Sequence, residues 1–172
     1  MRPDQGMIYT IISGTNRQRS YTEKVAKEYQ RLLREKNIDA AVSSLENLDV
    51  LKRTPEFLTF EKDVLIPTGK FIFIVPEYNG TFPGVLKAMI DNTDIKKVWY
   101  HKKALLTGIA TGRAGNLRGL DHLSASLNYL KMDVHHNKLP ISVIDKVMDE
   151  NGRLNDETIK VINEQLNEFI KY

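Results

Sequence analysis

Runs of consecutive apolar residues alternate along the chain with longer segments whose apolar residues recur every three or four positions. The first run, residues 7–13, is rich in β-branched side chains and is followed by Gly14. Residues 20–36 then carry apolar side chains at the spacing of one face of an amphipathic helix. The first elements predicted are therefore a strand and a helix.

The same alternation continues to the last residue. Further strands are predicted over residues 38–45, 71–75 and 104–110, a fifth strand is predicted within residues 133–143, and helices are predicted over residues 85–90, 120–130 and 155–172. The run at residues 71–75 is apolar on both faces, which is typical of a central parallel strand covered on both sides. Strands that alternate with helices predict a doubly wound parallel sheet. At this length we expect one domain over residues 1–172, with residues 1–6 as a flexible N-terminal extension.

Residues 47–69 interrupt this order. Pro55 and Pro67 lie among them, and proline ends or bends a regular element at most positions. The pattern fits either a short irregular helix or a long loop, and the sequence does not decide between the two.

The composition excludes several kinds of catalytic site and partner. The 172 residues include no cysteine, which excludes thiolate nucleophiles and cysteine-ligated metals, so that an organic cofactor would have to carry any electrons. The 25 Lys and Arg against 22 Asp and Glu give a net charge of +3 without long blocks of one sign, and we expect no nucleic-acid partner. No apolar stretch is long enough for a membrane span or a signal peptide, so a cytoplasmic location without membrane attachment is expected.

The loop after the first strand has the composition of a phosphate-binding loop. Its candidate ligands are Gly14, Thr15, Arg17, Ser20 and Thr22. Free backbone N–H groups and the positive end of the helix dipole favour an anion at such a position, and Arg17 adds charge. Ser20 and Glu23 also match a capping box, which many helices have without any ligand. The loop matches neither the Walker A nor the GxGxxG pattern, which argues against a nucleotide triphosphatase or a Rossmann dinucleotide site.

The loops after the third and fourth strands supply further candidates. They are Pro76, Glu77, Tyr78, Asn79 and Gly80 in the third loop, and Thr111, Gly112 and Gly115 in the fourth. Asn79-Gly80 is also a hairpin signal, but the helical pattern that follows predicts a turn from a strand into a helix, at the edge where parallel sheets bind ligands. Backbone amides and aromatic walls there suit a heteroaromatic ring, with the Glu77 carboxylate pointing away from it.

No metal site and no catalytic acid or base is expected. His135 and His136 are adjacent, and two successive residues on a strand face opposite sides of the sheet. They are therefore not expected to bind one metal ion.

Taken together, the three loops resemble those of the NADPH-dependent FMN reductase family of flavodoxin-like proteins, which includes quinone, chromate and azo-dye reductases. The family's Gly-Ser/Thr-x-Arg-x-x-Ser motif corresponds to residues 14–20, and its Pro-Glu-Tyr-Asn-Gly-x-x-Pro-Gly-x-Leu-Lys motif stands unbroken at residues 76–87. Residues 92–94 lack the tryptophan that relatives often place there, and residues 112–116 are less glycine-rich than the family loop. These departures concern the substrate side of the site.

The resemblance implies a flavodoxin-like α/β three-layer sandwich whose five-stranded parallel sheet has the order 2-1-3-4-5. It implies FMN as cofactor, with its phosphate on the first loop and its ring against residues 76–80. NADPH or NADH would be the electron donor, and a quinone, free flavin, azo dye or metal oxyanion the acceptor. A homodimer or homotetramer is also implied.

Two alternatives to an oxidoreductase stay open at this point. One is a flavodoxin-type electron carrier, which the net charge of +3 disfavours because such carriers dock through acidic faces. The other is a non-catalytic flavin-binding module. Arg113 and Arg118 are either contacts for the phosphates of the dinucleotide or solvated surface residues.

Overall fold

A parallel β-sheet forms the centre of the protein in the computed structural model, which describes residues 6–172. Its strands are β1 (Tyr9–Ser13), β2 (Ala40–Ser44), β3 (Lys70–Pro76), β4 (Lys103–Ile109), β5 (Asp133–Val134) and β6 (Leu139–Ile141). They follow the order β2-β1-β3-β4-β5. The strand β6 also pairs with β4, further along it than β5 does. The strand order implied by the family resemblance is therefore confirmed, with β6 in addition.

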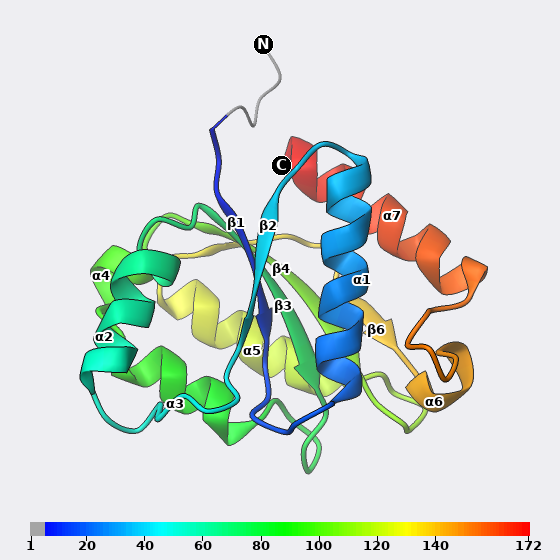
Figure 1. Ribbon diagram of the computed structural model, residues 1–172, viewed down its shortest axis with the longest axis horizontal. Coiled ribbons are helices and arrows are strands. Elements are labelled where there is room, and N and C mark those ends of the chain that lie inside the picture. The colour runs from blue at the N-terminus through cyan, green and yellow to red at the C-terminus, as the bar shows by residue number, and fades with distance from the viewer. Residues whose placement is uncertain (1–5) are drawn as a thin grey trace.

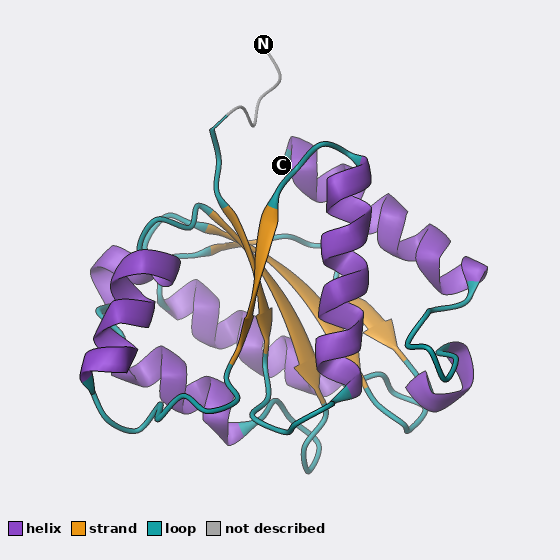
Figure 2. Ribbon diagram, viewed as in Figure 1, coloured by secondary structure: helices purple, strands orange, loops and turns teal. Residues whose placement is uncertain are grey.

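Helices cover both faces of this sheet (Figures 1 and 2). They are α1 (Tyr21–Glu35), α2 (Pro55–Phe60), the π-helix η1 (Glu61–Leu65), α3 (Gly84–Asn92), α4 (Ile95–Val98), α5 (Leu117–Tyr129), α6 (Ile144–Val147) and α7 (Asp156–Lys171). Buried residues of α1, α6 and α7 share one core with Ile72 and Ile74 of β3, while α2, α3, α4 and α5 share the other with Phe71 and Phe73. Alternate residues of one strand thus supply two cores, which makes three layers.

The segment predicted to hold the fifth strand, residues 133–143, does hold β5, and it holds the additional strand β6 as well. Residues 135–138 turn between them, closed by a bond of 3.0 Å from the Lys138 N–H to the His136 carbonyl. This turn moves the chain along β4, from the partner of Ala104 to the partner of Thr107.

Residues 47–69 contain the irregular helix rather than the long loop. Thr54 caps α2, and Pro55 takes its first position, where the missing N–H costs nothing. The helix widens into η1 at Glu61 and ends before Pro67. Proline here begins and limits a helix instead of breaking one.

The predicted N-terminal extension lies mostly outside the described residues, which begin at Gly6. Within residues 6–172, none of the helices combines the length and the apolar character that a membrane crossing requires.

Candidate functional site

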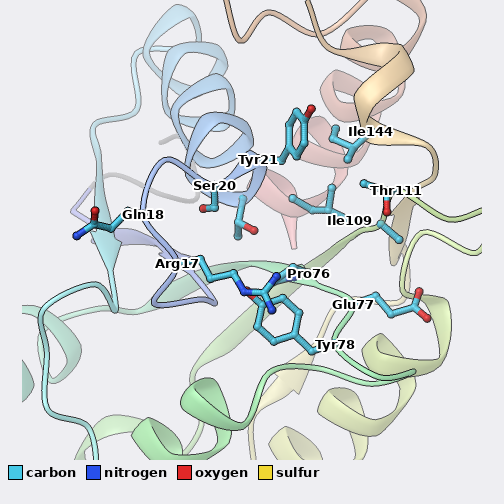
Figure 3. A pocket seen from close by; sticks show the side chains of 12 residues that line it. Arg17, Gln18, Ser20, Tyr21, Pro76, Glu77, Tyr78, Ile109, Thr111 and Ile144 are labelled. Carbon is cyan, nitrogen blue, oxygen red and sulfur yellow. The ribbon is translucent and has the colours of Figure 1, made fainter. Parts of the chain in front are cut away.

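Three loops meet at one edge of the sheet, around a pocket of about 250 Å³ (Figure 3). Strands β1, β3 and β4 are parallel neighbours, so the loops that follow them emerge side by side. Of the residues predicted from the sequence, those that line the pocket are Arg17, Ser20, Thr22, Pro76, Glu77, Tyr78 and Thr111. The fold thus brings together groups from all three predicted loops.

The first loop leaves backbone donors free at the start of α1. Ser20 is the N-cap, and its Oγ accepts the N–H of Glu23 at 3.2 Å. The Glu23 carboxylate pairs with Lys27 at 2.6 Å, and the N–H groups of Tyr21 and Thr22 have no partner within residues 6–172. The Ser20 half of the predicted capping box is confirmed, whereas the Glu23 carboxylate bonds to Lys27. The Ser20 hydroxyl still has a proton to donate.

Thr15, Arg17 and Tyr78 join the first loop to the third. The hydroxyl oxygens of Thr15 and Tyr78 are 2.6 Å apart, and Thr15 Oγ1 also accepts the backbone N–H of Arg17 at 3.2 Å. The Arg17 guanidinium lies over the Tyr78 ring, 4.1 Å from its centroid. In the part of the chain that the structure describes, no carboxylate pairs with Arg17, so its charge is available to an anion.

The third loop contains a two-residue turn with the chemistry of a hairpin. Asn79 and Gly80 have φ angles of 51° and 80°, and Tyr78 and Thr81 exchange backbone bonds of 2.8 and 3.2 Å across them. Because α3 follows at Gly84, the prediction that this loop joins a strand to a helix is confirmed. The rejection of the hairpin signal was wrong for the turn itself, which closes a short antiparallel bridge between Tyr78 and Thr81. The backbone N–H groups of Asn79 and Gly80 have no partner among the described residues.

The fourth loop is held against the end of β3 by Asn116, which the sequence analysis missed. Its Nδ2 donates to the carbonyls of Val75 at 3.1 Å and Pro76 at 3.0 Å. Its φ of 63° places it in the left-handed region, where asparagine is enriched. An asparagine directly before a helix indicates an N-cap, but the Asn116 side chain makes no cap bond, so the sequence carried no signal for this contact.

Several predicted residues lie behind the pocket wall rather than on it. A Cβ on Gly14 would lie 3.0 Å from the Ile74 carbonyl oxygen, and one on Gly115 would lie 2.7 Å from the Pro140 carbonyl carbon. Both glycines therefore allow close packing of the chain. Thr15 is 1% exposed beneath the first loop, whereas Gly112 is exposed with nothing near its missing Cβ.

The pocket has further lining residues that the sequence did not indicate: Gln18, Tyr21, Ile109, Ala110 and Ile144. Ile144 comes from α6, whose approach to the first loop depends on the tertiary fold. In Figure 3 the Glu77 carboxylate points away from Arg17.

Two basic residues of α5 flank the turn of the third loop. A Cβ on Gly80 would lie 3.4 Å from Nη1 of Arg118, and Nδ1 of His122 lies 2.8 Å from the Thr81 hydroxyl. Arg113 is exposed. Arg118 is therefore beside the third loop, while the Arg113 carbonyl accepts the Ser142 hydroxyl at 2.8 Å, after β6.

The argument that His135 and His136 face opposite ways was wrong. Their ring centroids are 4.4 Å apart, because β5 ends at Val134 and strand alternation no longer applies. With Glu168 they place candidate ligand atoms within 4.8 Å of one another. His135 bonds to Ala104 near the start of β4, so this cluster lies at the opposite end of the sheet from the pocket. The absence of a bound metal stays a prediction.

Comparison with known proteins gives a family match over most of the chain. The model of the NADPH-dependent FMN reductase family matches residues 7–143. A quinone reductase of Pseudomonas putida is 26% identical over 159 residues, which cover 86% of this chain and 84% of that protein. An NAD(P)H-dependent FMN reductase of Pseudomonas aeruginosa is 36% identical over 101 residues, or 55% of this chain and 54% of that protein.

Solved structures share the fold at lower identity. FerB, a flavoenzyme NAD(P)H:acceptor oxidoreductase from Paracoccus denitrificans, has a TM-score of 0.75 at 21% identity, covering 98% of this chain and 97% of its own. A flavodoxin from the domain Archaea has a TM-score of 0.63 at 14% identity, covering 96% of this chain and 100% of its own. These likenesses confirm the flavodoxin-like fold that the sequence implied.

Proposed function

The chain belongs to the NADPH-dependent FMN reductase family, and from this premise we propose that its pocket binds FMN and passes two electrons from NADPH or NADH to a small acceptor. The acceptor we propose is a quinone, because two relatives matching most of the chain are named quinone reductases. Free flavins, azo dyes and metal oxyanions are the other acceptors that the family resemblance suggests.

The single observation that carries this proposal is the set of unpaired donors at the start of α1. Arg17, Ser20, Tyr21 and Thr22 all line the pocket. Within residues 6–172, the N–H groups of Tyr21 and Thr22 have no acceptor, and the Arg17 guanidinium has no carboxylate partner. The Ser20 hydroxyl proton is also available. Such a set fits the phosphate of FMN, because a helix N-terminus and a guanidinium both favour an anion rich in acceptor oxygens.

The third loop fits the polar edge of the flavin ring. The N–H groups of Asn79 and Gly80, which have no partner within residues 6–172, can donate to ring acceptors, and fixed amide donors stabilise negative charge that develops on reduction. When bound, FMN supplies the hydride chemistry itself. The protein's part is to bind, orient and expose the ring, so that the reacting atoms approach closely. We therefore assign no general acid or base.

Of the two arginines considered for the phosphates of the dinucleotide, Arg118, beside Gly80, is a better candidate than Arg113.

The test is oxidation of NADPH, followed at 340 nm in the absence of oxygen, by the protein with FMN and a benzoquinone. We expect turnover well above that of free FMN with the same quinone. A rate equal to that of free FMN would leave the flavodoxin-type carrier or the non-catalytic module.

Variants of the first loop test whether it binds the FMN phosphate. Arg17→Ala and Ser20→Ala should each weaken FMN binding by roughly 10- to 150-fold, because a hydrogen bond to a charged group contributes roughly 1.5–3 kcal/mol. Arg34→Ala, which removes an exposed arginine near the other end of α1, is the matched control. Equal affinities in all three variants would move the phosphate site elsewhere. The homodimer or homotetramer stays a prediction, and sedimentation velocity of the FMN-loaded protein measures it.

A further inference from the structure

We propose that Tyr78 is a positioning residue for the phosphate end of the pocket, so that the preference of this chain for FMN over riboflavin depends on the Tyr78 hydroxyl. The inference rests on the proposed FMN site. It assigns to a side chain of the ring-binding loop a function at the opposite end of the ligand.

Tyr78 holds Arg17 in two independent ways (Figure 3). Its hydroxyl lies 2.6 Å from Thr15 Oγ1, and that oxygen accepts the backbone N–H of Arg17 at 3.2 Å. Its ring supports the Arg17 guanidinium at 4.1 Å. The backbone and the side chain of Arg17 are therefore both placed by one tyrosine that lies 63 residues from Thr15 in the sequence.

Either hydroxyl of the Thr15–Tyr78 pair can be the donor. Thr15 Oγ1 already accepts from Arg17, and a hydroxyl oxygen has two acceptor positions. If Tyr78 donates its proton to Thr15, both positions are filled and the Thr15 proton stays free to donate. Thr15 is 1% exposed, so water does not readily replace either bond.

Tyr78 is itself firmly placed. Its backbone N–H and carbonyl both bond to Thr81 across the Asn79-Gly80 turn, and the preceding Glu77 N–H bonds to the Ile109 carbonyl at 2.9 Å. Because these bonds fix the main chain of the third loop, the tyrosine side chain is a stable support against which the first loop is ordered. An arginine whose face is packed keeps its N–H edge available to an anion.

Comparing FMN with riboflavin isolates the contribution of the phosphate end to the binding free energy. Riboflavin has the same ring and ribityl chain as FMN but no phosphate. A residue that acts only by placing Arg17 and the first loop therefore affects binding of FMN and leaves binding of riboflavin nearly unchanged. A residue that acts through the pocket wall or the stability of the fold affects both ligands alike.

The experiment is fluorescence titration of FMN and riboflavin into the wild-type chain, Tyr78→Phe, Thr15→Val and the double variant. Tyr78→Phe keeps the ring under Arg17 and removes only the hydroxyl. We expect it to weaken FMN binding roughly 3- to 10-fold, the loss typical of one hydrogen bond, with riboflavin affinity changed by less than about twofold. Thr15→Val also removes the acceptor of the Arg17 N–H, so it should weaken FMN binding at least as much as Tyr78→Phe. The double variant should lose no more than Thr15→Val alone.

Tyr129→Phe is the matched control, because it removes the hydroxyl of a tyrosine that is 87% exposed on α5. Tyr78→Leu adds a second step: it also removes the support of the guanidinium, so it should lower the FMN-to-riboflavin preference further than Tyr78→Phe does.

The outcomes distinguish the two proposals. A wild-type chain that binds neither flavin contradicts the proposed function. A wild-type chain that prefers FMN, with the same preference in Tyr78→Phe, overturns the inference and leaves the function standing. Equal losses of FMN and riboflavin in Tyr78→Phe overturn it too, since they would show that the hydroxyl serves the ring or the fold.

Discussion

Single side chains decide how the loops of this pocket are held. Asn116 bonds to the carbonyls at the end of β3, and Tyr78 bonds to the first loop. Each ties together segments that are far apart in the sequence, although the Asn116 Oδ1 stays without a hydrogen-bond partner within the described residues. At this scale the sequence predicted which residue types gather in the loops. It did not predict which of them bind to one another.

His135 gives a prediction for the dependence of stability on pH. Burial lowers the pKa of His135 below its ordinary value of 6.5, and His136 and Lys70 lower it further, while Glu168 and Asp133 act in the opposite direction. The folded state therefore resists protonation more than the unfolded state does. Stability is complete above about pH 6.5 and falls as the pH decreases below that value, because the unfolded chain takes up the proton first.

The measurement is urea unfolding at pH 7.5 and pH 5.0. We expect His135→Gln to lose less free energy of unfolding between these two pH values than the wild-type chain loses. His101→Gln, at an exposed position, is the control and should lose as much as the wild type. If His135→Gln matches the wild type as well, His135 does not contribute to the acid sensitivity.

Among the elements, the α2–η1 segment shows how a buried charge fixes an irregular helix. The Glu61 side chain is 7% exposed and pairs with Arg53 at 2.8 Å. Glu61 also accepts the backbone N–H of Asp94 at 2.6 Å, and Arg53 bonds to the Asn92 carbonyl. These bonds fasten the segment to the junction of α3 and α4, at a place where the sequence showed only two interrupting prolines.

Arg53→Ala should lower the free energy of unfolding by about 2–3 kcal/mol, because it leaves the buried Glu61 carboxylate with one hydrogen-bond donor. Urea denaturation at neutral pH measures the loss. Adding Glu61→Gln to Arg53→Ala should recover part of it, since a neutral amide is less costly to bury than an unpaired charge. Lys62→Ala, at an exposed position of the same helix, is the control, and a loss in that variant equal to the loss in Arg53→Ala would contradict this explanation.

At the scale of the whole molecule, the site lies where three separate connections meet on a sheet with a core on each face. Ile72 and Ile74 pack into one core, and Phe71 and Phe73 into the other. The rigid part of the protein is thus the sheet, and the loops inherit their relative positions from it. A ligand that bridges the loops should therefore stabilise the folded state as a whole.

FMN at 100 times its dissociation constant should raise the free energy of unfolding by about 2.7 kcal/mol. For a chain of this size that corresponds to an increase in Tm of roughly 5–10 °C. Differential scanning calorimetry with and without FMN measures the increase. Arg17→Ala, at the same concentration of FMN, should show a smaller one, and an unchanged Tm of the wild type would contradict FMN binding to the folded state.

The sequence by itself determined the fold class, the strand order through its family resemblance, and the three loops that carry the site. Apolar periodicity and local motifs are properties of neighbouring residues, so they are readable without a structure. The tertiary structure alone decided the division of β5 from β6, the proximity of His135 and His136, the entry of Ile144 into the pocket, and the contacts of Tyr78 with Thr15 and Arg17. Each depends on how segments distant along the chain pack together, and a pattern of local spacing does not encode that packing.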